Sequence, residues 1–481
     1  MKRSLPLLLS ALLLAGSVLP ACGGAKENST PAQASDVSAT TQAATTADPY
    51  LPDAEKDYAG KQFTVLSTSD LKYICAEEEN GNGINDAMVA RERATEEKLN
   101  VTISYKLFPT ISEVEPALKE AVMAGDDTYQ LVVNHVNSNL TGYITENIAA
   151  DWNTVPHIDF SMPYWNKDVI SSLSVNGKSP IASGDITITD TVFMLFNKEL
   201  AEDLSLGSLY DLVTDGTWTW DKLSKISSDV KADLNGDGTM DMEDRYGVVV
   251  NVTGSSWMLR DVPSSCGQFI YTNTPKGLTL TVQNEKTQTV LEKMCALFNG
   301  GGGLVLKVGT SQVTDGAAKF NEGHYLTYFV ASRDAAYSFS DLSFDYGILP
   351  LPKWDDKQEN YYALSWNPNI ILSKIADADY CGLVTEWLAY YSYTYFRPAF
   401  YDSLMSSRFA QDARSVEMLD IINTNLVYDP GMQFSSPGFY SYFDGLVMQN
   451  NTNFTSRYNT YLESETAYLK TLNEAFANFG K

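Results

Sequence analysis

The segment from 233 to 244 carries side chains whose types and spacing suit a calcium ion. It reads D-L-N-G-D-G-T-M-D-M-E-D, which matches a D-x-[DN]-x-[DN]-G loop with Asp where a final Glu is usual. Ca²⁺ takes about six to eight oxygen ligands, and Gly238 permits the sharp turn that brings alternate side chains together. The predicted ligands are the side-chain oxygens of Asp233, Asn235, Asp237, Asp241 and Asp244 and the carbonyl oxygen of Thr239. The expected role is structural, because this is not a paired regulatory EF-hand. The alternative is a polar turn with solvated carboxylates.

The residue types that enzymes use for catalysis form no recognisable motif in the sequence. Its three histidines, His135, His157 and His324, are not spaced as H-E-x-x-H or H-x-x-x-H. It has no G-x-S-x-G or G-x-G-x-x-G segment, and no phosphate-loop motif surrounds the glycine run 300–303, which is predicted to be a flexible break. The sequence therefore favours a protein that is not an enzyme. Because an acidic chain contains many carboxylate pairs that could serve glycoside hydrolysis, a glycan-active enzyme stays open as an alternative.

The composition and net charge of the chain limit the kinds of molecule that it is expected to bind. The 481 residues include 60 Asp and Glu against 34 Lys and Arg, a formal net charge of −26. Such a surface repels phosphate backbones, so no nucleic acid is expected as a partner. Because 44% of the residues are hydrophobic, the chain can bury a sizeable core, and its length suggests about three compact units or two large lobes.

The first residues have the pattern of an export signal. Lys2 and Arg3 precede an apolar stretch over 5–19, which is too short to remain as a membrane span. The stretch ends in L-P-A-C, which resembles a bacterial lipobox, so residues 1–21 are predicted to be a lipoprotein signal peptide and Cys22 to be acylated, for example with palmitate. Residues 22–57 are poor in large apolar side chains and are predicted to be a disordered tether. The expected location is the extracytoplasmic face of the bacterial cell membrane. An ordinary cleaved signal with an incidental cysteine is the alternative.

Four more cysteines, Cys75, Cys266, Cys295 and Cys381, follow at long and irregular intervals. Four cysteines allow three pairings, between which the sequence does not choose. Buried free thiols are an equally good interpretation.

The elements that must position these residues alternate between strand and helix. Strand-like runs over 63–67, 101–105 and 129–133 are separated by helical patterns over 85–100 and 112–125. This alternation predicts βαβ units and an α/β fold with ligands at the carboxyl ends of parallel strands, which points to Asp70 and His135. Further strands are predicted over 191–196, 246–252, 326–330 and 369–372, and further helices over 220–232, 285–299, 378–395, 415–425 and 461–476. This is more than one sheet normally holds, so two sheets and two lobes are predicted.

Short motifs in a specific order carry a family likeness. They are N-D-A with R-E-R and E-E-K-L-N-V over 85–101, M-P-Y-W-N over 162–166, G-D at 184–185, F-N-K over 196–198, G-T-W-T-W-D over 216–221, R-Y-G after the calcium loop, F-N-E-G over 320–323, and Y-G-I-L-P-L-P over 346–352. Together they resemble bacterial extracellular solute-binding proteins of family 1, the substrate-binding lipoproteins of carbohydrate ABC importers. The likeness covers nearly all of the chain after residue 60.

The resemblance implies a two-lobed, periplasmic-binding-protein-like fold of type II with a ligand cleft between the lobes. The family's chain path implies an N-terminal lobe over 58–188 and 366–400 and a C-terminal lobe over 189–365 and 401–481. It also implies a monomer that captures a small-molecule solute, a sugar or oligosaccharide above all, and delivers it to the membrane subunits of an ABC permease. A calcium-dependent adhesion module is a further alternative.

Sugar sites combine polar side chains with aromatic faces. The candidate solute-binding residues are Asp70, His135, Asp185, Trp257, Arg260, Tyr328, Arg333, Trp366 and Asn367. Trp366 is the strongest of them, because it precedes the apolar run 370–372 where a strand crosses between lobes, and its loss should affect affinity more than folding. No catalytic residue is predicted.

Overall fold

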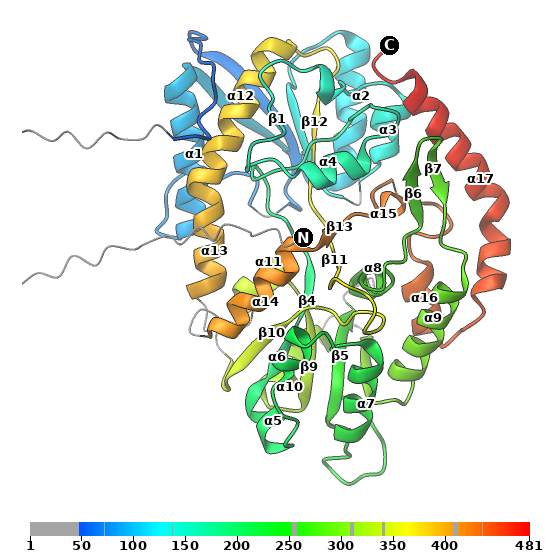
Figure 1. Ribbon diagram of the computed structural model, residues 1–481. Helices are drawn as coiled ribbons and strands as arrows, with labels where there is room; N and C mark the ends of the chain where they lie inside the picture. The colour runs from blue at the N-terminus through cyan, green and yellow to red at the C-terminus, as the bar shows by residue number, and fades with distance from the viewer. Residues whose placement is uncertain are drawn as a thin grey trace, which may run out of the picture. The chain divides into compact units, whose positions relative to one another are not determined.

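The computed structural model describes residues 48–71, 73–136, 138–252, 257–307, 312–338, 342–406, 412–434 and 436–481. The chain divides into two compact units, Met1–Asp48 and Pro49–Lys481, and all the elements below belong to the second (Figure 1). The predicted signal peptide, Cys22 and the tether up to residue 47 lie outside the described residues. Within the described part, no helix has both the length and the apolar character that a membrane crossing requires.

The first sheet has the strand order β12-β3-β1-β2, with β1 parallel to both of its neighbours and β12 antiparallel to β3. Successive residues of a strand point to opposite faces, and Val132 and Val133 accordingly pack in two different core clusters. Both faces of this sheet are therefore buried, as is usual for parallel strands. The strands are β1 (Lys61–Thr68), β2 (Val101–Phe108), β3 (Leu131–Asn134) and β12 (Asn369–Leu372).

The second sheet has the order β10-β4-β9-β5-β8 and mixes parallel and antiparallel pairs. β4 and β9 are buried at every position, which explains their continuous apolar sequence. The strands are β4 (Val192–Asn197), β5 (Tyr246–Val252), β8 (Gly303–Lys307), β9 (Tyr325–Ala331) and β10 (Tyr346–Leu349).

Helices cover both sheets, and two short strand pairs complete the unit. The helices are α1 (Gly83–Leu99), α2 (Val114–Ala124), α3 (Leu140–Thr145), α4 (Lys167–Leu173), α5 (Lys198–Asp203), α6 (Leu209–Thr214), α7 (Trp220–Val230), α8 (Asp261–Ser265), α9 (Glu285–Phe298), α10 (Gln312–Asn321), α11 (Ser332–Ser338), α12 (Ala378–Tyr391), α13 (Arg397–Ser406), α14 (Ala413–Thr424), α15 (Pro430–Gln433), α16 (Tyr442–Met448) and α17 (Phe454–Asn478). The short turns are η1 (Ile111–Glu113), η2 (Trp152–Thr154), η3 (Trp257–Arg260) and η4 (Ser392–Phe396), and the paired strands are β6 (Tyr271–Thr274) with β7 (Gly277–Leu280) and β11 (Ala363–Leu364) with β13 (Leu426–Val427).

Two extended segments connect the sheets and run antiparallel to each other. Isolated bridges join Ala182 to Ile370 and Thr191 to Ser365. A third connection is helical, because α12 continues through the π turn η4 into α13. This is the layout expected of two lobes joined by crossing strands.

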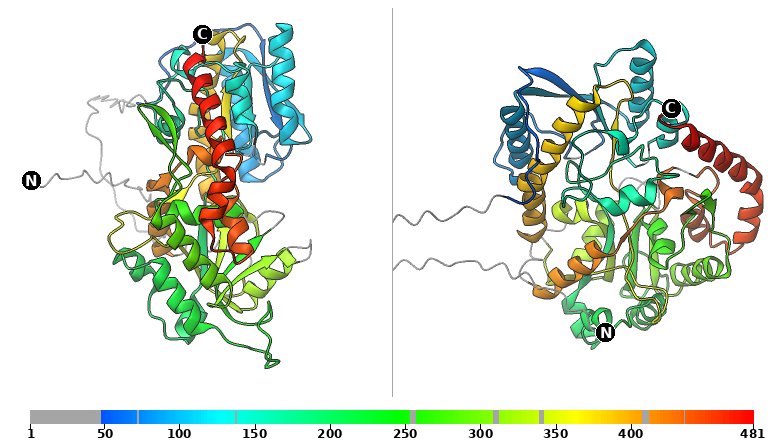
Figure 2. Two further views of the ribbon diagram at one scale, coloured as in Figure 1. Left: turned by 90° about the vertical axis from the view of Figure 1, so that its right-hand side faces the viewer. Right: turned by 45° about the horizontal axis from the view of Figure 1, so that its top comes forward.

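Helix α17 contacts elements of both lobes, and Figure 2 shows it passing from one to the other. Tyr468 shares a hydrogen bond with Thr141 of α3, which follows the first sheet's β3. Asn473 pairs with the backbone of Leu278 in β7 at 2.8 and 2.9 Å, and α17 also touches α9, which packs on β8. The lobe boundaries predicted from the family's chain path stay a prediction.

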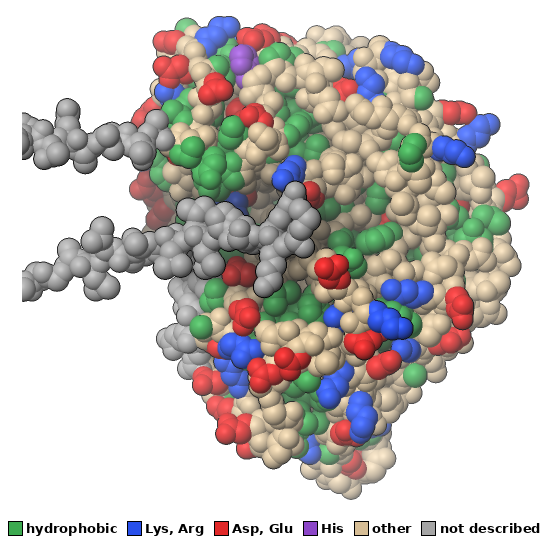
Figure 3. Space-filling view, in the orientation of Figure 1, with side chains coloured by type: hydrophobic (Ala, Val, Ile, Leu, Met, Phe, Trp, Pro, Cys, Tyr) green, Lys and Arg blue, Asp and Glu red, His purple; other side chains and the backbone are tan. Residues whose placement is uncertain are grey.

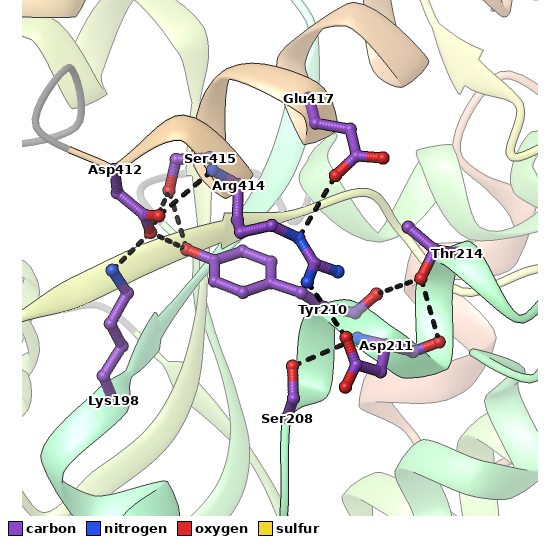
Figure 4. A network of polar contacts seen from close by, with 9 residues as sticks. All are labelled: Lys198, Ser208, Tyr210, Asp211, Thr214, Asp412, Arg414, Ser415 and Glu417. Atoms are coloured by element: carbon purple, nitrogen blue, oxygen red, sulfur yellow. Dashed lines mark hydrogen bonds and ion pairs between the residues drawn. The ribbon is translucent and has the colours of Figure 1, made fainter.

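A polar network fixes the start of α14 to the helices after β4 (Figure 4). Asp412, the N-cap of α14, accepts hydrogen bonds from Lys198 and from the hydroxyl of Tyr210. The same hydroxyl lies 2.8 Å from Ser415 Oγ, and Arg414 donates to Asp211 at 3.0 Å. The chain returning from α13 is thereby anchored on the second sheet's side of the molecule.

The predicted strands are confirmed to within a few residues, but three local predictions are wrong. The glycine run is a tight turn into β8, since Gly302 has φ +94° and a Cβ there would lie 2.1 Å from the Ser227 carbonyl oxygen. The helix predicted over 378–395 changes to a π turn after Tyr391. The end of the predicted tether, 49–57, is ordered, and the Ala54 carbonyl accepts the indole N–H of Trp387 at 2.7 Å. Cys75, Cys266, Cys295 and Cys381 are free thiols, which decides the open pairing question.

Helix α12 places an ionisable side chain, Glu386, in the core. Glu386 is 2% exposed and accepts hydrogen bonds from Tyr164 Oη at 2.7 Å and Trp165 Nε1 at 2.8 Å. Burial raises the pKa of Glu386 to about 7, against these hydrogen bonds, which favour the carboxylate. The folded state thus retains this proton to a higher pH than the unfolded chain does.

We expect this carboxyl to make stability depend on pH. Its stabilising contribution is fully present below pH 4.5 and is lost as the pH rises through about 7. Denaturant unfolding at pH 5 and pH 8 should show a drop of about 1–3 kcal/mol that is smaller in Glu386→Gln. An identical drop in the two proteins would contradict this origin.

Candidate solute-binding cleft

A cavity of about 100 Å³ lies where residues from both lobes meet, lined by His135, Asp190, Trp257, Arg333 and Trp366. His135 follows β3 of the first sheet, and Arg333 follows β9 of the second. The carboxyl ends of strands are where α/β sheets bind ligands, so the cavity has the expected place. Four of its five lining residues are among the nine predicted from sequence.

Asp190 and Arg333 form the charged part of the cavity. Asp190 Oδ1 accepts from Ser332 Oγ at 2.7 Å and from the Arg333 backbone N–H at 3.2 Å, while Oδ2 lies 3.3 Å from Arg333 Nε. Burial raises the pKa of Asp190, and the Arg333 guanidinium opposes this shift. Arg333 is held through Nε, and its Nη1 and Nη2 make no hydrogen bond to another described residue, which leaves donors for a solute.

Trp366 and Trp257 form the aromatic part. Their rings meet edge to face, with centroids 5.5 Å apart and planes at 81°. Trp366 is 6% exposed, and its Nε1 donates to both carboxylate oxygens of Asp261, at 2.9 and 3.1 Å. Its backbone N–H donates to the Asp190 carbonyl at 2.8 Å. Trp366 is thus a wall of the cavity and also a core residue, so the expectation that its loss would spare folding is wrong.

His135 contributes a side chain from the first lobe to the lining of the cavity. Burial, assisted by the charge of Arg333 and opposed by that of Asp70, lowers the pKa of His135 to about 4. The imidazole is therefore neutral near pH 7. Asp70 lies in the turn after β1 and is exposed, so it stands near His135 without lining the cavity.

Asp185 lies apart from the other candidates. It lines a second cavity of about 450 Å³ together with Thr189, Arg397 and other residues, and its Oδ2 lies 3.3 Å from Arg397 Nη1. Burial raises the pKa of Asp185 to about 6, opposed by Arg397. Because Thr189 lines this cavity and the adjacent Asp190 lines the first, the two cavities lie on opposite sides of the crossing segment.

Arg260, Tyr328 and Asn367 are buried in roles that do not expose them to the cavity. Arg260 Nη2 pairs with Asp444 Oδ2 at 3.2 Å, with side chains 7% and 6% exposed. Tyr328 is 2% exposed and stacks on Phe320 at 5.3 Å, because it belongs to a strand in the middle of the second sheet. Asn367 Nδ2 donates to Ser183 Oγ at 2.8 Å and joins the two crossing segments. The side chains of these three residues therefore do not line the cavity with the other candidates.

Two carboxyl groups of this region were absent from the sequence prediction. Asp190 precedes strand β4, whereas ligand-binding residues are expected at positions that follow strands. Asp261 opens the short helix α8, where no pattern marks it. A polar residue flanked by Thr189 and Thr191 just before a buried strand was the one available signal for Asp190.

The loop over 233–244 adopts the predicted turn. Gly238 has φ +80°, and the Asp233 carboxylate accepts the N–H groups of Gly236 and Gly238 at 2.6 and 2.8 Å. Asp244 is buried and accepts the N–H groups of Leu234 and Asp241, both at 2.9 Å. The donors are all oxygens, which fits Ca²⁺ chemically. In the described part of the chain, however, no three His, Cys, Asp or Glu side chains are gathered as a ready metal site.

Two α/β sheets joined by crossing segments, with a cavity between them at the strand ends, define a two-lobed, periplasmic-binding-protein-like fold. Solved structures bear this out. One is the cyclic α-maltosyl-1,6-maltose binding protein from Arthrobacter globiformis, with a TM-score of 0.58, 13% sequence identity, and coverage of 87% of this chain and 100% of that one. Another is an ABC substrate-binding protein from Listeria monocytogenes in complex with cycloalternan. It has a TM-score of 0.53 and 12% sequence identity, and the match covers 87% of this chain and 98% of that one.

A third similar structure has a different kind of ligand. UgpB from Mycobacterium tuberculosis, in complex with glycerophosphocholine, has a TM-score of 0.56 and 12% identity and covers 86% of this chain and 98% of that one. No protein-family model and no curated protein matches the sequence. At these identities the likeness establishes the fold, and the predicted fold class is confirmed.

Proposed function

We propose that this protein is the substrate-binding component of an ABC importer and captures a sugar or oligosaccharide in the cavity between its lobes. The observation that carries the proposal is that cavity, with two indole rings, a neutral histidine and an Asp–Arg pair contributed from both sides. Closing two lobes over such a cavity would bury a solute against groups of both. The protein acts as a monomer that binds its solute and does not transform it.

A sugar fits this combination of side chains. Aromatic faces pack against the C–H faces of a sugar ring, and carboxylate and guanidinium groups bond its hydroxyls. Asp190 and Arg333 offset each other, so the cavity does not call for a strongly charged solute. The similar proteins named above as binding maltosyl-maltose and cycloalternan support this class, whereas the glycerophosphocholine complex shows that the fold also serves other solutes.

The test is a thermal-shift and calorimetric screen of the chain lacking 1–21, with maltose, maltotriose, maltotetraose, cycloalternan and glycerophosphocholine. A ligand at about 100 times its Kd should stabilise the folded state by about 2.7 kcal/mol. Stabilisation by a glucan that is recovered intact supports import. Hydrolysis products would favour the glycan-active enzyme, and stabilisation by glycerophosphocholine alone would overturn the choice of sugar.

The partners in the membrane follow from the proposed role. A lipid on Cys22 would hold the protein at the extracytoplasmic face of the cell membrane, where its lobes reach the permease. The folded unit that begins at Pro49 is separated from Cys22 by a polar segment, which gives it reach.

We expect Cys22→Ser to release the protein from the membrane into the medium. Several acyl chains hold a protein firmly where a single chain binds only marginally, so loss of the acylated thiol should have a large effect. Membrane and soluble fractions are compared by immunoblot, with Cys75→Ser as the matched thiol control. Equal retention of the wild type and Cys22→Ser would contradict lipidation.

The loop over 233–244 is proposed to bind one structural Ca²⁺. The support is its oxygen-only donor set and the turn at Gly238; Asp in the last position is shorter than Glu and binds less tightly. Asp233, Asn235, Asp237, Asp241 and Asp244 and the Thr239 carbonyl would hold the ion. A bound ion would offset the mutual repulsion of these carboxylates and stabilise the loop.

Metal analysis should find about one calcium per wild-type chain, and much less in Asp237→Ala. The exposed Asp203 at the end of α5 provides a control variant, Asp203→Ala, which should keep the ion. Chelation should lower the melting temperature of the wild type and the control but not of Asp237→Ala. The same calcium content in all three proteins would refute the site.

A further inference from the structure

The residues around Trp366 are arranged to hold its ring in one position. Trp257 and Asp261 stand one helical turn apart, across η3 and the start of α8. Trp257 packs edge to face on the Trp366 ring, and Asp261 accepts its indole N–H. The turn formed by η3 and the start of α8 therefore contacts Trp366 twice, through the ring of Trp257 and through the carboxyl group of Asp261.

This turn is itself fixed to the rest of the second lobe. Arg260, between the two contacting residues, pairs with Asp444 at 3.2 Å and lies 4.4 Å from the ring centroid of Tyr440. Trp366, in turn, is fixed at its backbone by the Asp190 carbonyl. Because the elements on either side are anchored, movement of the indole would break its hydrogen bond to Asp261 and its packing on Trp257.

A buried carboxyl group such as that of Asp261 is an unusual hydrogen-bond acceptor for holding an indole ring in place. It is fully buried, and both of its oxygens are directed at a single N–H group. Burying a carboxyl group is costly unless its hydrogen bonds compensate, so a purely structural need would be met more cheaply by an apolar residue. Burial raises the pKa of Asp261 well above its ordinary value, with Asp190 adding to the shift, and Asn is its close mimic in shape with an oxygen that can accept the same N–H group.

We propose that Asp261 is a positioning residue of the solute site, which fixes the Trp366 indole as the wall of the cavity and affects solute binding only through that ring. The expected effect of Asp261 on solute binding rests on the proposed function, but the positioning of the Trp366 ring can be measured without a solute. Asp261 does not line the cavity, so it contributes no contact of its own.

The first experiment observes the indole N–H groups of the eight tryptophans by ¹⁵N NMR on the solute-free protein. The Trp366 signal is assigned by its absence from Trp366→Phe. We expect it to be protected from solvent exchange in the wild type and in Asp261→Asn, and to shift and exchange at least about tenfold faster in Asp261→Leu. Trp165 is the internal control, because its indole donates to another buried carboxylate, Glu386, and its signal should not move. If Asp261→Leu does not fold, it is replaced by Asp261→Ser, whose side chain is too short for its oxygen to reach the indole N–H.

The second experiment measures affinity for maltotetraose. Asp261→Leu should weaken binding about tenfold and Asp261→Asn by less than about threefold, whereas in a Trp366→Phe background Asp261→Leu should cause no further loss. An unchanged Trp366 signal in Asp261→Leu, or an equal loss of affinity in both backgrounds, would overturn the proposal. If wild-type protein binds none of the glucans, the proposed function fails, and the NMR result still decides whether Asp261 positions the ring.

Discussion

Replacing Trp366 with Ala is expected to weaken solute binding about ten- to hundredfold and to lower the free energy of unfolding by about 3–5 kcal/mol. The loss of affinity follows from removing an indole wall of the cleft cavity. The loss of stability follows from its burial, since the ring packs on Trp257 and donates to Asp261. Removing it leaves a void and a buried carboxyl group without its donor.

Calorimetric titration and denaturant unfolding of the same preparation separate the two effects. Trp354→Ala is the matched control, because Trp354 is half-buried beneath Lys293, 4.3 Å from its ring centroid, and does not line the cavity. It should lose stability and retain affinity. Unchanged affinity in folded Trp366→Ala would remove this residue from the site.

Arg260→Ala is expected to destabilise the protein by about 3–5 kcal/mol, although Arg260 was predicted to bind solute. The substitution leaves the Asp444 carboxylate, 6% exposed, without its charged partner at 3.2 Å. The guanidinium also packs on the ring of Tyr440, and this contact is lost as well.

The double variant Arg260→Met, Asp444→Leu provides the control. Replacing both members of a buried ion pair by apolar residues of similar size is often neutral for stability, so urea unfolding should show most of the loss recovered. Its affinity for a bound glucan should stay within about threefold of the wild type. A stable double variant that no longer binds would return Arg260 to the solute site.

The inner strands of both sheets could be predicted because burial on two faces produces continuous apolar runs. The expected spans 246–252 and 369–372 match β5 and β12 at both ends. Helix α17 was predicted to begin at 461 but begins at Phe454, since its first turn is rich in polar and β-branched residues and is secured by the Asn453 side chain, which accepts the Ser456 N–H. Local pattern therefore finds an element more reliably than it finds its capped end.

The cavity could be predicted in part, for a different reason. His135 and Trp257 could be predicted because each follows a strand. Arg333 follows the 320–323 motif, and Trp366 lies on the predicted second crossing. Asp261 could not be found in this way, because it meets Trp366 across 105 residues of sequence, and only tertiary packing makes that contact. Arg260 was chosen wrongly because an arginine that anchors a turn and one that binds a solute have the same local sequence.

The contacts of α17 with both lobes have a consequence for rates. An opening wide enough to release a bound solute must disrupt the pairing of Tyr468 with Thr141 on one side or that of Asn473 with β7 on the other. If these contacts persist in the solute-bound state, their loss adds to the activation barrier for dissociation. Affinity differences between related complexes arise mostly in the dissociation rate constant. Under the proposed function, helix α17 would thus lengthen the residence time of a captured solute without touching it, and the permease would have to overcome that barrier to receive its cargo.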